Sequence, residues 1–254
     1  MTESPDLPRI DTFKALFLDF DGTLVPFAQE PDGIVVPTFL PGLLIDLAEA
    51  LDGALALVSG RSIENIDRHL GGLPLAIAGE HGGQVRRAGG PVTVRAAASF
   101  GAELERARRT FSAIDGVLVE TKAAGFAVHY RKAPAAMTAV TDVMNRMVED
   151  RPDLELIHGK CVCELRTTGI SKAGAINDFM HETPFSDRVP IFAGDDTTDE
   201  DGFRTVNALG GESVKVGEGE TCARWRVGSV SQVHAWLTAE RDRLAGPSGM
   251  VARD

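Results

Sequence analysis

The sequence predicts an α/β protein, in which a doubly wound parallel sheet of the Rossmann-like type forms the core and a smaller α+β cap is inserted into it. Two observations favour this fold class. Short apolar runs alternate with helical segments in both outer parts of the chain, whereas the middle part follows a strand-rich pattern of its own. We therefore assign residues 1–96 and 169–254 to the core and residues 97–168 to the cap.

The core strands are expected to be buried on both faces. Four short apolar runs lack the alternation of polar residues that marks a half-exposed strand, which is typical of parallel strands covered by helices on both sides. These runs lie near residues 14–19, 54–58, 74–78 and 189–193. Apolar residues recur at helical spacing in residues 40–51 and 63–70, so helices are expected between the strands.

The inserted segment is predicted to fold as helix, two strands, helix, two strands (αββαββ). Its first helix is indicated by apolar residues at helical spacing from Phe100 to Phe111. The second helix is indicated in the same way by Met137, Val140, Met144 and Met147. We expect these methionines to fill the core of the cap rather than to bind a cofactor.

Composition excludes several classes of protein. The 254 residues suit one or two domains, and a net charge of −11 argues against nucleic-acid binding. No apolar run approaches the roughly 20 residues of a membrane span, and the N-terminus lacks a secretory signal, so we expect no membrane association and a cytoplasmic location. The three cysteines are odd in number, and Cys161 and Cys163 lack zinc-site spacing.

An apolar strand ends in two carboxylates, Asp19 and Asp21, with one residue between them. Residues i and i+2 of an extended segment point the same way, so both acids can converge on one point. They repel each other unless a cation sits between them or one of them takes a proton. Gly22 allows a sharp turn and Thr23 adds a hydroxyl. A solvated turn at a strand end is the alternative interpretation.

Two further strands end in groups that suit an anion or a metal ion. Ser59-Gly60-Arg61 follows the second strand and offers a hydroxyl and a guanidinium group. Lys172 lies in the first turn of a predicted helix, where backbone N–H groups also favour an anion. The strand near residues 189–193 ends in an acidic turn with Asp195, Asp196 and Asp199. In an open α/β sheet these strand ends share one crevice, so the groups are expected to meet there.

In this order the motifs resemble those of the haloacid dehalogenase-like phosphohydrolases. The four motifs are Asp19-x-Asp21-Gly-Thr, Ser59-Gly-Arg61, Lys172 and Gly194-Asp195-Asp196-x-x-Asp199. The chain is similar to the trehalose-6-phosphate phosphatases in particular. That narrower resemblance is carried by Glu30-Pro-Asp32, Ala78-Gly-Glu80-His81-Gly82 and His129-Tyr130-Arg131.

The resemblance implies a hydrolase core that cleaves a phosphate monoester with Mg²⁺ through an aspartyl phosphate. Asp19 would attack phosphorus, and Asp21 would act as general acid and then as general base. Ser59 and Lys172 would hold the phosphoryl oxygens. The implied ligands of Mg²⁺ are Asp19, Asp21 through its backbone carbonyl, and Asp195, with Asp196 and Asp199 behind them to hold waters or orient Lys172.

The expected substrate contacts are Arg61 and Gly82 in the core and Glu120, Arg131, Lys160 and Glu164 in the cap, as the resemblance implies for the cap residues. In the run Gly159–Arg166, strand alternation puts Lys160 and Glu164 on one polar face and Cys163 on the other. An ordinary solvated face is the alternative. Arg61 either reaches the phosphate or anchors its turn, and we expect His81 to pack or to act as a hinge.

The resemblance implies a trehalose-6-phosphate phosphatase, with trehalose 6-phosphate as the small-molecule substrate and Mg²⁺ as the cofactor. One alternative is a phosphatase for another sugar phosphate. A second is a catalytically silent sugar-phosphate sensor or a partner of the synthase, which the complete set of motif residues argues against. We expect a monomer, and association with trehalose-6-phosphate synthase stays open.

Overall fold

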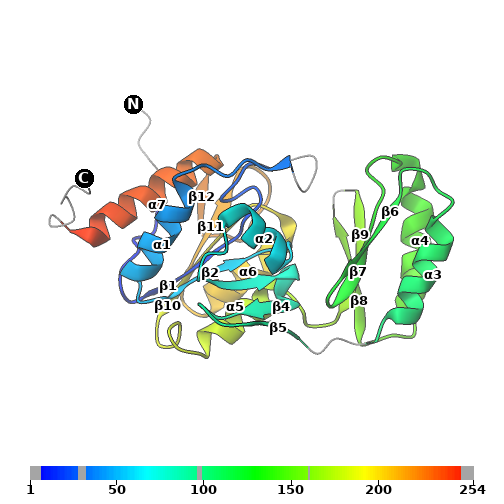
Figure 1. The fold of residues 1–254 in the computed structure, drawn as a ribbon, viewed down its shortest axis with the longest axis horizontal. Coiled ribbons are helices and arrows are strands. Elements are labelled where there is room, and N and C mark those ends of the chain that lie inside the picture. The colour runs from blue at the N-terminus through cyan, green and yellow to red at the C-terminus, as the bar shows by residue number, and fades with distance from the viewer. Residues whose placement is uncertain (1–6, 28–32, 96–98, 160, 247–254) are drawn as a thin grey trace. The chain divides into compact units, whose positions relative to one another are not determined.

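The computed structural model describes residues 7–27, 33–95, 99–159 and 161–246, and the chain divides into two compact units (Figure 1). Residues 1–93 and 171–254 form one unit, the core unit, and residues 94–170 form the other, the cap unit. Among the described residues, no helix is both long and apolar enough to cross a membrane.

The core unit is built on one eight-stranded sheet with the order β12-β11-β10-β1-β2-β3-β4-β5. The bounds of these strands are β1 Lys14–Leu18, β2 Leu55–Val58, β3 Ala76–Gly79, β4 Gln84–Arg86, β5 Val92–Val94, β10 Val189–Gly194, β11 Glu212–Val216 and β12 Trp225–Val227. The strands from β12 to β3 are all parallel. The predicted doubly wound fold is confirmed, but β4 runs antiparallel to β3 and extends the sheet in a way that the sequence analysis did not include.

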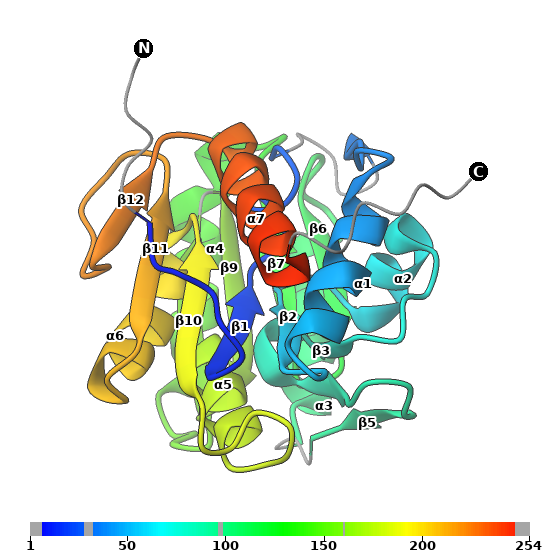
Figure 2. The ribbon, with the colours of Figure 1, turned by 90° about the vertical axis from the view of Figure 1, so that its left-hand side faces the viewer.

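Helices cover both faces of this sheet (Figure 2). Their bounds are α1 Leu40–Ala50, α2 Ile63–Leu70, α5 Lys172–Met180, α6 Glu200–Ala208 and α7 Val230–Ala245. Helices α1 and α7 pack against each other, as do α5 and α6 on the other side of the sheet. Because both faces are covered, β1 and β2 are buried almost throughout, which explains their uninterrupted apolar sequences.

Serine caps place the helices that matter for the site. Ser62 accepts a hydrogen bond from the backbone N–H of Asn65 at the start of α2, and Gly71 ends that helix in the left-handed conformation. Ser171 caps α5 by accepting from the N–H of Gly174, so Lys172 is the first residue of the helix. The backbone at both helix starts is therefore held by a local side chain.

The cap unit has a four-stranded antiparallel sheet with the order β6-β7-β9-β8. Its elements are α3 Gly101–Phe111, β6 Leu118–Lys122, β7 Gly125–His129, α4 Met137–Val148, β8 Leu154–Gly159 and β9 Val162–Thr167. This is the predicted αββαββ order. One face of the sheet joins the buried side chains of both helices in a separate apolar core that includes Phe111, Phe126, Met144 and Leu165.

Two details of the cap differ from expectation. The predicted continuous strand Gly159–Arg166 is wrong at its start, because β8 ends at Gly159 and β9 begins only at Val162. Met137 was expected in the core, yet 53% of it is exposed. Met137 is the first residue of α4, and only the later positions of that helix reach the apolar core.

The core of the larger unit depends on Phe17 in the central strand β1. Phe17 is fully buried, and its ring lies 5.4 Å from that of Phe185 and 6.2 Å from that of Phe179. We predict that Phe17→Ala lowers the free energy of unfolding of the core unit by about 3–5 kcal/mol, because it leaves a cavity that the sheet cannot close. Urea denaturation followed by circular dichroism measures this.

The matched control is Phe13→Ala, just outside the same strand, where 76% of the residue is exposed. Its effect should stay within about 0.5 kcal/mol. Equal losses for the two variants would contradict the assignment of Phe17 to the core.

Candidate active site

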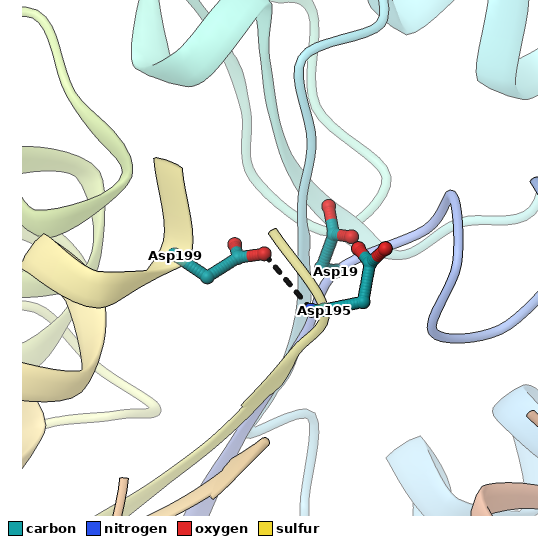
Figure 3. Close-up of side chains that lie close together, drawn as sticks. All are labelled: Asp19, Asp195 and Asp199. Carbon is teal, nitrogen blue, oxygen red and sulfur yellow. Dashed lines mark hydrogen bonds between the residues drawn. The ribbon is translucent and has the colours of Figure 1, made fainter. Parts of the chain in front are cut away.

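The candidate site lies where two neighbouring strands end. Asp19 follows β1 and Asp195 follows β10, and these strands are parallel neighbours in register from Lys14 to Leu18. The backbone N–H of Asp19 donates to the carbonyl of Ala193 at 2.9 Å, so the pairing continues up to the acidic residue. Figure 3 shows the side chains of Asp19 and Asp195 next to each other, with Asp199 approaching the backbone of Asp195.

Lys172, the first residue of α5, links two of these acids. Its Nζ donates to Oδ1 of Asp19 at 2.7 Å and to Oδ1 of Asp199 at 2.6 Å. Burial alone would lower the pKa of this lysine, but the negative charges of Asp19 and Asp199 outweigh burial and raise its pKa above the ordinary value. Lys172 therefore stays a buried ammonium group next to Asp19.

Asp199 accepts hydrogen bonds at both of its carboxylate oxygens. Its Oδ1 accepts from Lys172, and its Oδ2 accepts from the backbone N–H groups of Asp195 at 3.0 Å and of Asp196 at 2.9 Å. The residue is completely buried. Asp199 thus orients Lys172 and shapes the turn that carries Asp195.

Two glycines are required for the acids to come this close. A Cβ on Gly22 would lie 2.0 Å from Oδ2 of Asp195, and its φ of +72° is unfavourable for other residues. A Cβ on Gly194 would lie 2.4 Å from Cγ of Asp199. The glycines of the two motifs therefore allow the turns after β1 and β10 to pack against acidic side chains.

The donor set fits a divalent cation. Carboxylate oxygens of Asp19, Asp195 and Asp199 lie within 4.8 Å of one another. Burial, followed by the charge of Asp199, raises the pKa of Asp195 to about 6, and burial also raises the pKa of Asp19 against the opposing effect of Lys172. A hard cation with oxygen ligands would relieve this repulsion. Since Asp199 already accepts three hydrogen bonds, Asp19 and Asp195 are the side chains best placed to bind it.

Asp21 is not one of the three clustered acids, and its carboxylate is paired with Arg61. Both of its oxygens accept from Arg61, from Nε at 2.6 Å and from the terminal Nη2 at 2.7 Å. Of the two expectations for Arg61, the structure shows the contacts of an anchor. The backbone carbonyl of Asp21, expected among the metal ligands, stays a prediction.

Ser59 and the loop after β3 lie beside this pair. Ser59 is buried, its Oγ accepts from the N–H of Arg61 at 3.2 Å, and its carbonyl accepts from the N–H of His81 at 2.8 Å. The ring of His81 fills the space that a Cβ on Gly60 would enter at 2.9 Å. A Cβ on Gly82, whose φ is +103°, would lie 3.1 Å from that of Ala175. Close packing against α5 therefore accounts for Gly82, and its expected contact with substrate stays a prediction.

In the cap unit, Glu120 and Glu164 lie on the same face of the sheet. Both pair in register with Ala127, Glu120 from β6 and Glu164 from β9. Glu120 Oε2 lies 2.7 Å from Nε2 of His129, and this hydrogen bond holds the pKa of Glu120 below its ordinary value. Of the other two cap residues expected to bind substrate, Arg131 is exposed after β7, and Lys160 lies outside the described residues. Their roles stay predictions.

Two largely buried lysines, one in each unit, contact candidate residues and were not singled out by the sequence analysis. Lys122 Nζ donates to Oε2 of Glu164 at 2.5 Å, with both side chains largely buried. Lys122 lies two residues after Glu120 in β6, so strand alternation puts it on the same face, and that was the available signal. Lys215, buried at the end of β11, donates to the backbone carbonyl of Asp195. Its signal is a lysine within the apolar strand Glu212–Val216.

The acidic residues of the cluster repel one another, so the stability of the metal-free protein should depend on pH. The pKa of Asp195, about 6 against an ordinary 3.8, means that the folded protein disfavours its charged form. Without a cation, the contribution of Asp195 to the free energy of unfolding is therefore most favourable at low pH, where the carboxyl group is protonated. It is lost as pH rises through about 6. We predict that Asp195→Asn raises the free energy of unfolding by about 1–3 kcal/mol at pH 8 in chelator, and by less than about 1 kcal/mol at pH 4, close to the ordinary pKa.

Urea denaturation at the two pH values checks this, with Asp201→Asn as the control. Asp201 forms an exposed i,i+3 pair with Arg204, and its removal should change little at either pH. A variant Asp195→Asn that is less stable than the wild type at pH 8 in chelator would contradict the repulsion.

Comparisons with known proteins agree with this geometry. The chain matches the trehalose-phosphatase family over residues 17–230. It is 42% identical over 240 residues to the trehalose-6-phosphate phosphatase of Escherichia coli (strain K12), across 93% of this chain and 89% of that relative. A solved trehalose-6-phosphate phosphatase related protein matches with a TM-score of 0.71 at 28% identity, over 90% of this chain and 97% of the other. A haloacid dehalogenase-like hydrolase from Bacteroides thetaiotaomicron shares the fold, with a TM-score of 0.69 at 15% identity over 91% and 99% of the two chains. The chain therefore belongs to the trehalose-phosphatase family, a family of phosphoric monoester hydrolases with the haloacid dehalogenase-like fold.

Proposed function

We propose that this protein is a Mg²⁺-dependent phosphatase that hydrolyses trehalose 6-phosphate to trehalose and phosphate through an aspartyl phosphate on Asp19. The observation that carries the proposal is the buried arrangement of Asp19 with Lys172 and Asp199. The substrate follows from membership of the family and from the relative in Escherichia coli, whose name states it.

Asp19 is the nucleophile in this proposal. Lys172 donates to its Oδ1 at 2.7 Å, whereas its Oδ2 accepts from the hydroxyl of Thr23 at the long distance of 3.4 Å. Oδ2 is therefore the less engaged oxygen and the better one for attack on phosphorus. An ammonium group has three N–H donors, and Lys172 gives one to Asp19 and one to Asp199. The third suits a phosphoryl oxygen, with the hydroxyl of Ser59 as a second donor from the neighbouring strand end.

Asp21 transfers the protons. In the first step it protonates the sugar oxygen as the bond from phosphorus to that oxygen breaks and the aspartyl phosphate forms. In the second step it takes a proton from the water that attacks phosphorus, which frees Asp19 and releases phosphate. One carboxyl group two residues from the nucleophile thus serves both half-reactions.

Mg²⁺ bound by Asp19 and Asp195 would neutralise charge on the phosphoryl group and hold it in line for attack. Asp196 and Asp199 stabilise the backbone turn that carries Asp195. Asp199 holds the backbone of Asp195 and Asp196, and Asp196 in turn caps the short helix Thr197–Asp199 by accepting from the N–H of Thr197 at 2.7 Å. The turn that presents Asp195 is therefore rigid before a cation binds.

The polar face of the cap sheet supplies the contacts to the sugar. Carboxylate and ammonium groups provide the directional hydrogen bonds that a polyol needs, and Glu120, Lys122 and Glu164 cluster on one face. The core residues bind the phosphate, which every phosphate monoester shares. Discrimination between sugars is therefore assigned to the cap.

A phosphatase for another sugar phosphate is the second candidate function. The charged groups on the cap face can form hydrogen bonds with the hydroxyl groups of several disaccharides. A silent sensor is disfavoured, since the nucleophile and its lysine are both in place. The cytoplasmic location, the monomeric state and association with a synthase stay predictions.

The proposal predicts phosphate release that depends on both the sugar and the metal. With Mg²⁺, kcat/KM should be highest for trehalose 6-phosphate within a panel that includes sucrose 6-phosphate, glucose 6-phosphate and p-nitrophenyl phosphate. Excess chelator should abolish turnover for all of them, because the acidic cluster is left without its cation. Assays of released phosphate measure this.

Asp19→Asn is the control for the chemistry, since it keeps the shape of the side chain and removes the nucleophile. Its activity should fall below about one per cent of wild type, because the covalent route is lost. Full activity in chelator, or a preference for a different sugar phosphate, would contradict the metal or the substrate respectively.

A second prediction concerns the cap. Glu164→Gln should lower kcat/KM for trehalose 6-phosphate by roughly tenfold to a hundredfold, which corresponds to one lost charge-assisted hydrogen bond of about 1.5–3 kcal/mol. Activity on p-nitrophenyl phosphate should change little, since this ester lacks the sugar. Steady-state kinetics on the two substrates give the ratio.

Glu105→Gln is the matched control, because Glu105 lies on helix α3 of the same unit in an exposed pair with Arg108. Glu105→Gln should leave kcat/KM unchanged for both substrates. Equal losses on the two substrates for Glu164→Gln would show that this face serves the stability of the cap instead.

A further inference from the structure

Arg61 and Asp21 form a two-pronged ion pair between residues 40 positions apart in the chain. Nε and Nη2 of the guanidinium group each donate to a different oxygen of the carboxylate, at 2.6 and 2.7 Å. Parallel bonds of this kind fix direction as well as distance, because the planar guanidinium matches the plane of the carboxylate. The carboxyl group of Asp21 therefore has one defined orientation.

The guanidinium group is itself held from a second side. Nη1 of Arg61 donates to Oδ1 of Asn65 at 2.6 Å, and Asn65 lies in the first turn of α2, where Ser62 fixes the backbone. The group also lies 5.9 Å from the ring centre of Phe20, the residue between Asp19 and Asp21. Its position is thus determined by α2 on one side and by the turn after β1 on the other.

The backbone of Arg61 is equally well fixed. Its N–H donates to Oγ of Ser59 at 3.2 Å, and its carbonyl accepts from the N–H of Glu80 at 2.8 Å. The turns after β2 and β3 therefore hold the start of this long side chain while Asp21 and Asn65 hold its end. A side chain restrained at both ends is suited to positioning another group.

This pairing leaves room for the proton that Asp21 transfers. Each carboxyl oxygen has two lone pairs, and the bonds from Nε and Nη2 of Arg61 use one on each oxygen. About a quarter of the Asp21 side chain (26%) is exposed, against 11% for Arg61. Asp21 can therefore be held by Arg61 on one side and meet substrate or water on the other.

We propose that Arg61, oriented by Asn65, is a positioning residue that aims the carboxyl group of Asp21, and that it does not bind the phosphate of the substrate. The inference rests on the proposed function, because it takes Asp21 as the general acid. It departs from the expectation that Arg61 contacts substrate, and it extends the site to Asn65, which carries no motif of its own.

The two roles of Arg61 differ in how they depend on the leaving group. A sugar alkoxide is a poor leaving group and needs the proton from Asp21, whereas p-nitrophenolate leaves without one. A residue that aims Asp21 therefore affects kcat/KM for the sugar phosphate and hardly affects that for the aryl phosphate. This holds because kcat/KM reports the first half-reaction and not the hydrolysis of the aspartyl phosphate, which both esters share. A residue that binds phosphate matters equally for both, since both esters carry the same phosphoryl group.

The experiment measures kcat/KM of Arg61→Leu in the metal-loaded enzyme with trehalose 6-phosphate and with p-nitrophenyl phosphate. We expect a loss of about a hundredfold on the sugar phosphate and of no more than about threefold on the aryl phosphate. Asn65→Ala should show the same selective loss at a smaller size, about threefold to tenfold, with Arg61 still present. Similar losses on the two substrates would overturn the inference in favour of phosphate binding.

The chain offers a closely matched control for the loss of an ion pair. Arg86 and Asp67 form a second two-pronged pair, at 2.6 and 2.8 Å, with side-chain exposures of 11% and 28%, and Asp67 lies on the same helix α2. Arg86→Leu should destabilise the protein much as Arg61→Leu does, with no change in the ratio of the two substrates. A change of that ratio in Arg86→Leu would mean that the readout follows stability, and it would overturn the inference.

A double-mutant cycle separates this inference from the proposed function. In the background of Asp21→Asn, the change Arg61→Leu should lower kcat/KM for trehalose 6-phosphate by less than about twofold further, because the group that Arg61 aims is already gone. A full additional loss would overturn the inference alone. If Asp21→Asn by itself lowers kcat/KM equally for both substrates, Asp21 is not the general acid. That result would contradict the proposed mechanism itself, whatever the role of Arg61.

Discussion

The bridge that Lys172 makes between Asp19 and Asp199 is the interaction on which the site depends. An ammonium group buried with two carboxylates is costly unless every group is satisfied, and here both partners lie within 2.7 Å of Nζ. Asp199 also holds the turn of Asp195 through two backbone N–H groups. One lysine at the start of α5 therefore links the ends of β1 and β10. Removal of either partner would leave a buried charge without compensation, so the same contacts serve the fold and the proposed chemistry.

The remaining negative charge explains why the site suits a cation. Burial and mutual repulsion raise the pKa values of Asp19 and Asp195, so the folded core stores electrostatic strain in the absence of metal. Gly22 and Gly194 make this crowding sterically feasible. In the proposed function, stability is thus traded for carboxylates that are already placed to bind a cation. A second layer of support comes from Lys215, whose ammonium group donates to the carbonyl of Asp195.

Much of this site could be predicted, because strand ends in a doubly wound sheet converge whatever the detailed packing. Asp19, Lys172 and Asp195 follow from that rule and from motif spacing. The orientation of Asp21 could not be predicted, since its partner Arg61 lies on another strand end and only tertiary structure brings the two together. The antiparallel strand β4 was missed because Gln84–Arg86 is too short to show periodicity. Strand alternation predicted the polar face of Glu120 and Glu164, but it carried Lys160 onto a strand that begins only at Val162.

The central claim is that the Lys172 bridge holds Asp19 as the group that becomes phosphorylated. The most direct test is to quench the enzyme with acid during turnover of trehalose 6-phosphate with Mg²⁺, reduce it with borohydride and locate the product by peptide mass spectrometry. An aspartyl phosphate is reduced to homoserine, whereas a free carboxylate is not. The account predicts homoserine at position 19, only when substrate and Mg²⁺ are both present. Homoserine at another aspartate, or none at position 19 while phosphate is being released, would contradict it.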